Sequence, residues 1–134
     1  MILLDTHALL WLAEDDAKLG RHARIAIQAE EARRTSAMTY WEVAMLSRKG
    51  RVGVAMPVRR SLDELLDVAG IKAVPVTAAI AADAGALPSP IHGDPADRII
   101  IATARALGCP LVTSDRKILD YAAQGHLQAV DARR

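Results

Sequence analysis

Short strand-like runs alternate with helix-like segments along the whole of this chain of 134 residues. The predicted strands are 2–4, 35–38, 71–76, 111–113 and 127–130. This alternation is typical of a sheet whose strands run parallel, because each return to the same end of the sheet needs a crossover segment. We therefore predict an α/β fold with a central, mostly parallel sheet of four to five strands.

The predicted helices are 8–13, 21–34, 39–47, 58–68, 78–86, 95–107 and 118–123. Asp94 and Pro95 have the residue types of a helix cap and of a first helical residue, and Thr77 is a cap for the preceding helix. Gly70 and Gly108 follow the last apolar residues of two helices, where glycine commonly ends a helix. Residue types at the two ends of these segments therefore predict several of the helix boundaries.

The length and composition favour one domain over residues 1–134, because a chain of this length with 51% apolar residues can bury a sizeable single core. Its single cysteine, Cys109, excludes a disulfide framework and is predicted to be a core residue. Asp5 interrupts the first apolar run too early for a signal peptide, and no run approaches the roughly 20 apolar residues that cross a bilayer. We expect a soluble, cytoplasmic protein with no membrane segment.

Four carboxylates occupy the same kind of position in the predicted fold. Asp5 and Asp115 stand at the carboxyl ends of strands, while Glu42 and Asp97 lie in the first turns of helices. Because the carboxyl ends of parallel strands and the starts of the following helices share one edge of the sheet, we expect the four side chains to lie together. Each also has a local explanation: Asp5 fits a helix cap, and Thr39 with Glu42 fits the T-x-x-E capping box.

Carboxylates gathered at one edge repel one another, and burial adds to the cost of keeping them ionised. A divalent cation removes this repulsion, and a set of oxygen ligands suits Mg²⁺ or Mn²⁺ better than zinc. Such a cation binds a phosphate oxygen and activates a water, which is the chemistry of phosphodiester hydrolysis. The histidines are scattered without the spacing of zinc ligands: His7, His22, His92 and His126.

The acidic positions lie in segments that resemble the motifs of a known family. Leu-Leu-Asp-Thr-His at 3–7, with Leu-Trp at 10–11, resembles the opening of a PIN domain. Three further segments resemble later motifs of the family. The first is Ser36 with Trp-Glu-Val at 41–43, and the second is His-Gly-Asp-Pro-Ala-Asp-Arg at 92–98 with Ile-Ala-Thr-Ala at 101–104. The third is Thr-Ser-Asp at 113–115. The likeness spans nearly the whole chain. It is greatest to the VapC branch, the ribonuclease toxins of VapBC toxin–antitoxin pairs.

This resemblance implies a three-layer α/β/α domain and a metal-dependent endoribonuclease that hydrolyses RNA phosphodiester bonds. The catalytic residues that it implies, which would hold Mg²⁺ or Mn²⁺, are Asp5, Glu42, Asp97 and Asp115. Asp94 would then cap the helix beside the site, and Thr6 and Ser114 would place hydroxyls near the acids. Ala96 departs from the family pattern, which usually has an aromatic residue there, but no ligand is lost.

The resemblance also implies protein partners. A cognate antitoxin would cover the site and place a basic side chain among the acids, and the toxin would form a homodimer. Trp11 and Trp41 are predicted to lie in the core or at a partner interface, and stacking on an RNA base is the less favoured alternative. Basic residues predicted as candidate contacts to RNA phosphates are Arg48, Lys49, Arg51, Arg98, Arg116 and Lys117.

Two other functions stay open on the residues alone. Asp5 also has the position of the nucleophile in an aspartate-dependent, phosphatase-like hydrolase. A second acid two residues later would normally assist such a nucleophile, and here that position is His7. A binding module with the same fold but no turnover is the other alternative, against which the retention of all four acids argues.

Overall fold

The computed structural model describes residues 1–53, 57–91 and 93–134. His92, one of the four histidines discussed above, lies outside the described residues. Nothing in the described part of the chain is a helix long and apolar enough to cross a membrane.

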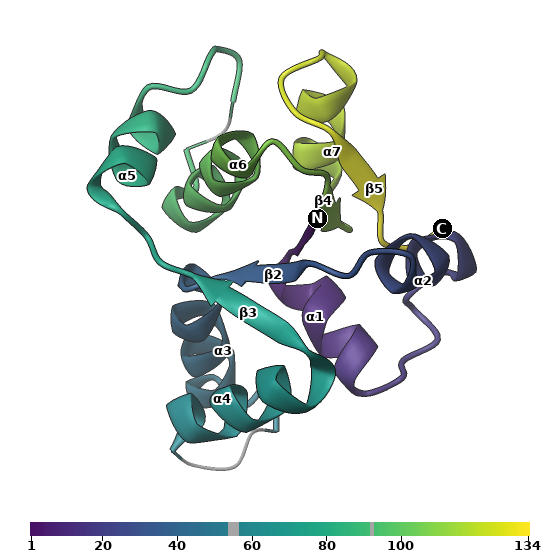
Figure 1. Cartoon of the computed structure of the whole chain (residues 1–134). Helices are drawn as coiled ribbons and strands as arrows, with labels where there is room; N and C mark the ends of the chain where they lie inside the picture. Colours follow the sequence, from purple (N-terminus) through teal and green to yellow (C-terminus); the bar gives the residue numbers. More distant parts are fainter. Residues whose placement is uncertain (54–56, 92) are drawn as a thin grey trace.

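A five-stranded sheet with the strand order β3-β2-β1-β4-β5 forms the centre of the molecule (Figure 1). The strands are β1 (Ile2–Leu4), β2 (Arg33–Ser36), β3 (Ile71–Val74), β4 (Leu111–Thr113) and β5 (Ala129–Asp131). All four neighbouring pairs are parallel. Since β1 pairs with β2 on one side and β4 on the other, the first strand of the chain is the middle strand of the sheet.

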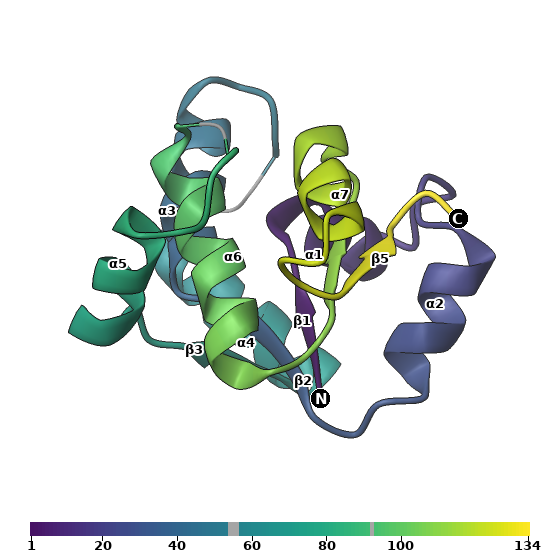
Figure 2. The same ribbon diagram turned by 90° about the horizontal axis from the view of Figure 1, so that it is seen from above.

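Helices cover both faces of this sheet, so the predicted α/β/α fold is confirmed (Figures 1 and 2). The helices are α1 (Thr6–Ala13), α2 (Arg21–Gln28), α3 (Met38–Arg48), α4 (Val58–Ala69), α5 (Ala78–Gly85), α6 (Pro95–Leu107) and α7 (Arg116–Ala123). In Figure 1, α5, α6 and α7 lie above the sheet, and α1, α3 and α4 lie below it.

Alternation of the side chains along β1 divides the core between the two faces. Ile2 and Leu4 pack with α1, α2 and residues of α4, whereas Leu3 packs with residues of α5, α6 and α7. All three side chains are buried, as expected for a central strand of a parallel sheet. A smaller apolar cluster joins α1, α3 and α4. Cys109 is buried in the core as predicted.

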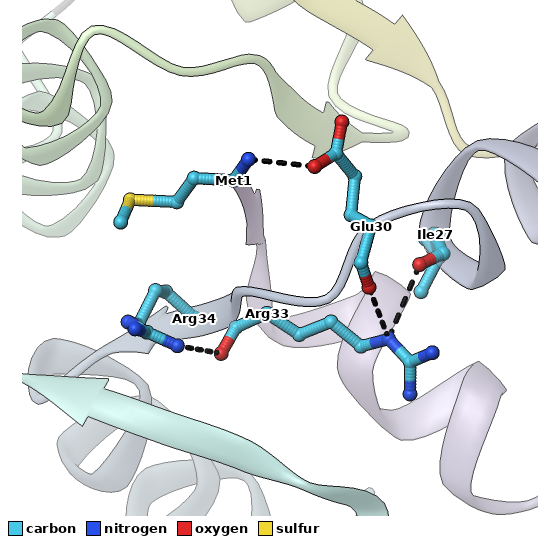
Figure 3. Close-up of polar contacts among 5 residues, drawn as sticks. All are labelled: Met1, Ile27, Glu30, Arg33 and Arg34. Carbon is cyan, nitrogen blue, oxygen red and sulfur yellow. Dashed lines mark hydrogen bonds and ion pairs between the residues drawn. The ribbon is translucent and has the colours of Figure 1, made fainter.

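The second helix is shorter than predicted, and the strand after it begins earlier. We predicted a helix over 21–34, but α2 ends at Gln28 and Arg33 is already the first residue of β2. Figure 3 shows the reason: the Arg33 Nε donates to the carbonyl oxygens of Ile27 and Glu30, 3.2 and 3.1 Å away. The amine of Met1 pairs with the Glu30 carboxylate at 2.6 Å (Figure 3). These contacts hold the turn in which the chain leaves the helix and joins the sheet.

Other boundaries agree with the sequence to within a few residues. Gly70 and Gly108 end their helices in the left-handed conformation, with φ of 67° and 64°. Thr77 caps α5 through a hydrogen bond from the Ile80 backbone N–H. The strand predicted over 71–76 ends at Val74, directly before Pro75, which has no N–H to donate to a neighbouring strand.

The end of the described chain packs against the start of α2. The Gly20 N–H donates to the Ala132 carbonyl oxygen, and the His22 N–H donates to that of Arg134, both at 2.8 Å. A Cβ at Gly20 would lie 2.1 Å from the backbone carbonyl carbon of Arg134. Glycine at this position therefore allows the two backbones to approach.

Candidate active site

Asp5 lies at the carboxyl end of the central strand and begins the candidate site. Its side chain is buried, with only 8% of the residue surface exposed. One carboxylate oxygen, Oδ1, accepts a hydrogen bond from the Thr6 backbone N–H at 2.8 Å, so Asp5 caps α1. The other, Oδ2, accepts a hydrogen bond from the Thr113 hydroxyl at 2.7 Å. Asp5 therefore has the capping role that we considered and is also tied to the end of β4.

Glu42 is half-buried and is the fifth residue of α3, so the prediction that it lies in the first turn of its helix is wrong. Its side chain reaches toward the start of α1. The Thr6 hydroxyl donates to its Oε1 at 2.9 Å. The capping-box prediction for Thr39 and Glu42 is wrong, because α3 begins at Met38 and the Ser36 hydroxyl accepts from the Met38 N–H. Glu42 is thus directed toward β1 rather than toward the end of its own helix.

Thr39 belongs instead to a group of three buried hydroxyls with Thr6 and Thr35. Its Oγ1 lies 3.1 Å from the Oγ1 of each of these residues. The Thr35 hydroxyl also lies 3.1 Å from the Leu4 carbonyl oxygen. The group connects β1, β2, α1 and α3 directly behind Glu42, and this role was not evident in the sequence.

Asp97 and Asp115 lie at the starts of the next two helices along this edge. Asp94 caps α6 by accepting from the N–H groups of Ala96 and Asp97, which confirms the predicted cap and places Asp97 in the first turn. Asp115 caps α7, and its own N–H donates to the Thr113 hydroxyl at 3.1 Å. Thr113 therefore links Asp5 to the segment that carries Asp115.

The pKa shifts show that these carboxylates interact. Burial is the main cause that raises the pKa of Asp97 to about 8, and repulsion from Asp5, Asp94, Asp115 and Glu42 adds to it. Burial followed by repulsion from Asp5 and Asp94 raises the pKa of Glu42 to about 7, although the Thr6 hydroxyl opposes the shift.

Burial also raises the pKa of Asp5, against the hydrogen bond from Thr113. The acids predicted to lie together are therefore within electrostatic reach of one another. The neighbouring negative charges stabilise the protonated forms of Asp5, Glu42 and Asp97.

The donor set fits a hard divalent cation, since it consists of carboxylate and hydroxyl oxygens. Among the described residues, no three Asp, Glu, His or Cys side chains are close enough to form a ready metal site. A cation bound here would therefore require the carboxylates to move closer together. It would also offset the repulsion that raises their pKa values.

A cavity of about 530 Å³ opens beside these acids. It is lined by Gly93, Asp94, Asp97, Asp115, Arg116 and Lys117. The two basic side chains are exposed at the start of α7 and form no salt bridge within the described part of the chain. An anionic ligand can therefore meet both the acids and two positive charges in this cavity.

Several other predicted residues lie elsewhere. The Arg98 guanidinium donates to the carbonyl oxygens of Ala84 and Gly85 at the end of α5, so it joins two helices. The His7 ring is exposed and lies 6.1 Å from the ring of Trp11, which is buried. Trp41, in contrast, is exposed. The roles of Thr113 and Thr39 were not predicted from the sequence, although the Thr-Ser-Asp motif contains Thr113.

Comparison with known proteins identifies the family. The PIN domain family matches residues 2–124. Ribonuclease VapC22 of Mycobacterium tuberculosis is 38% identical over 120 residues, which are 90% of this chain and 91% of that protein.

Solved structures have the same fold. A toxin–antitoxin complex from Klebsiella pneumoniae contains a chain with a TM-score of 0.65 and 24% identity, with 98% of both chains covered. VapBC2 from Rickettsia felis, bound to a DNA fragment from its promoter, gives a TM-score of 0.65 at 15% identity over 97% of this chain and 98% of that chain. The chain described here therefore belongs to the PIN domain family, and within it to the VapC-type proteins.

Proposed function

We propose that the chain is a metal-dependent endoribonuclease, the toxin of a toxin–antitoxin pair. The observation that carries the proposal is the convergence of four carboxylates on one edge of the sheet. Thr6 contacts both Asp5 and Glu42, and Thr113 links Asp5 to the segment of Asp115. Asp97 and Asp115 line the same cavity. The 38% identity to a protein named as a ribonuclease supports RNA as the substrate. The phosphatase-like alternative receives no comparable support, because the position two residues after Asp5 is an exposed histidine.

The residues that would hold Mg²⁺ or Mn²⁺ are Asp5, Glu42, Asp97 and Asp115. A cation bound among them would neutralise their charge, lower the pKa of a bound water and stabilise charge on the phosphate. Thr113 holds Asp5 through a hydrogen bond of 2.7 Å, and Thr6 holds Glu42 through one of 2.9 Å. Asp94 fixes the start of α6 and thereby the position of Asp97. These groups orient the ligands without taking part in the bond cleavage.

We also propose two protein partners, an antitoxin and a second copy of this chain. Solved structures of the same fold include toxin–antitoxin complexes, which supports an antitoxin that binds this chain. We expect that antitoxin to place a basic side chain among the acids, where it would offset the repulsion described above. The free toxin is proposed to form a homodimer. Light scattering that showed only monomer at micromolar concentration would contradict the dimer.

Purified protein should cleave RNA with Mg²⁺ or Mn²⁺ and lose the activity when the metal is chelated. Asp5→Asn and Asp97→Asn should each reduce cleavage by at least about a hundredfold, since each removes one charged ligand. Asp67→Asn is the matched control, because Asp67 is an exposed carboxylate on α4. Equal cleavage by all three variants would refute the assignment. Metal binding without cleavage would favour a binding module.

A further inference from the structure

Trp41 is an exposed tryptophan at the edge of the candidate active site. It has 56% of its surface exposed, although a side chain of this size and apolarity is usually largely buried. It immediately precedes Glu42 on α3. The structure does not need Trp41 for its core, which suggests that the side chain contacts a ligand.

A second cavity, of about 500 Å³, lies between α3, the segment after β3 and the start of α6. Its walls are mainly apolar and include Met38, Trp41, Val76 and Pro95. The volume is within the range of pockets that bind small organic groups. The cavity is therefore large enough for a flat ring placed against the Trp41 indole.

This apolar cavity adjoins the acids. Glu42 and Asp94 form part of its wall, and Asp94 also lines the cavity that contains Asp97, Asp115 and the two basic residues of α7. The two cavities thus meet at the start of α6, with Glu42 in the wall of one and Asp97 and Asp115 in the wall of the other. An extended polymer that crosses the start of α6 would place one group in the apolar cavity and a charged group in the cavity that contains the two basic residues.

We propose that the cavity beside Trp41 binds one nucleobase of single-stranded RNA, next to the bond that is cut, with the base stacked on the indole. A nucleotide carries a flat aromatic base, whose faces stack on apolar surfaces, and an anionic phosphate. This pair of groups matches the apolar cavity on one side of the start of α6 and the basic residues on the other. Stacking on an aromatic side chain is how proteins commonly hold single-stranded bases. On the other side, Arg116 and Lys117 are placed to contact a neighbouring phosphate. This inference rests on the proposed ribonuclease function.

The first test uses a short oligoribonucleotide that contains a bond cut by the parent protein, and a series in which each nucleotide in turn lacks its base. For the parent, removal of one base beside the cut should raise KM by about 5- to 150-fold. Trp41→Ala should show a similar rise with the intact oligonucleotide and no further rise with the abasic one. Trp41→Phe should retain most of the affinity. Val68→Ala is the control, because Val68 is 89% exposed on α4.

A second measurement separates this inference from the ribonuclease assignment. Quenching of tryptophan fluorescence by oligoadenylate should occur in the parent and disappear in Trp41→Phe, which keeps the buried Trp11. Quenching without RNA cleavage would support the proposed base-binding site and refute the proposed nuclease function. Cleavage by Trp41→Ala that equals the parent's would overturn the base site, as would the absence of quenching. Unchanged cleavage together with weaker self-association or weaker antitoxin binding would assign Trp41 to a protein interface.

Discussion

The Thr113 hydroxyl donates a hydrogen bond of 2.7 Å to the Oδ2 of Asp5, which is 108 positions earlier in the chain. The same hydroxyl accepts a hydrogen bond from the Asp115 N–H at 3.1 Å. Neighbouring parallel strands, β1 and β4, make this possible because both end at the same edge of the sheet. One buried threonine therefore fixes the positions of two proposed metal ligands relative to each other.

Thr113→Val should reduce metal-dependent cleavage by about 10- to 100-fold, because valine keeps the shape but cannot orient the Asp5 carboxylate. The effect should appear mainly as a higher metal concentration for half-maximal activity. Thr103→Val is the matched control, since Thr103 is also buried but donates to the Ile99 carbonyl oxygen within α6. Metal dependence of cleavage in the two variants is the measurement. An unchanged metal titration in Thr113→Val would contradict the role given to this hydroxyl.

Thr39→Val should lower the free energy of unfolding by about 1–2 kcal/mol, because it removes the hydroxyl that lies 3.1 Å from those of Thr6 and Thr35. Thr39→Ser keeps the hydroxyl and should therefore lower the free energy of unfolding by a smaller amount. Urea unfolding of the three proteins measures the difference. If Thr39→Val were as stable as the parent, the three hydroxyls would contribute nothing measurable to holding α3 on the sheet.

Without divalent metal, the protein should lose stability as the pH rises from about 4 to about 8. Burial and repulsion raise the pKa of Glu42 to about 7 and that of Asp97 to about 8 in the folded state. The unfolded chain releases these protons at lower pH, so the stability is present at low pH and is lost as the pH rises through the folded-state pKa values. Thermal unfolding in EDTA should show this decline, and Mg²⁺ should reduce it. A melting temperature that rises with pH over this range would contradict the raised pKa values of Glu42 and Asp97.

Asp97→Asn should separate stability from activity. The amide removes the charge that Asp5, Asp94, Asp115 and Glu42 repel, so the metal-free variant should melt a few degrees above the parent at pH 8. The variant should nevertheless fail to cleave RNA. At pH 4, where the parent carboxyl is protonated, the two melting temperatures should converge. An equal difference at both pH values would point to a packing effect instead of the charge.

Gly20→Ala should destabilise the fold by about 1–3 kcal/mol, because a Cβ there would lie 2.1 Å from the backbone of Arg134. Gly85→Ala is the control, since a Cβ at Gly85 meets no atom within 4 Å and alanine favours helix. Urea unfolding compares the two variants. Equal stability of Gly20→Ala and the parent would show that the end of the chain moves away at little cost.

The sequence predicted features that depend on local chemistry. The cap at Asp94, the proline after it and the glycine at Gly108 mark α6 because each residue type suits one backbone conformation. The parallel sheet followed from the order of the segments. The predicted length of α2 was wrong because contacts of Arg33 with carbonyl groups fix the end of this helix, and helical periodicity does not encode such contacts.

The site was predictable only in part for a similar reason. The four acids could be selected because strand ends and helix starts share an edge in a parallel fold. The role of Thr113 depends on the pairing of β1 with β4, and the capping box at Thr39 failed because tertiary contacts with Thr6 and Thr35 take its hydroxyl. Hydroxyls that act between distant segments have no signature in a single sequence.

The central position of β1 has a consequence for synthesis of the protein. A ribosome makes β1 long before β4, yet β1 needs β2 and β4 on its two sides to be buried. The nascent chain therefore cannot cover β1 on both sides until Leu111–Thr113 has emerged from the exit tunnel. Fragments that end before Leu111 lack Asp115 and the Thr113 hydroxyl that holds Asp5. Such fragments therefore lack groups that the proposed metal site needs.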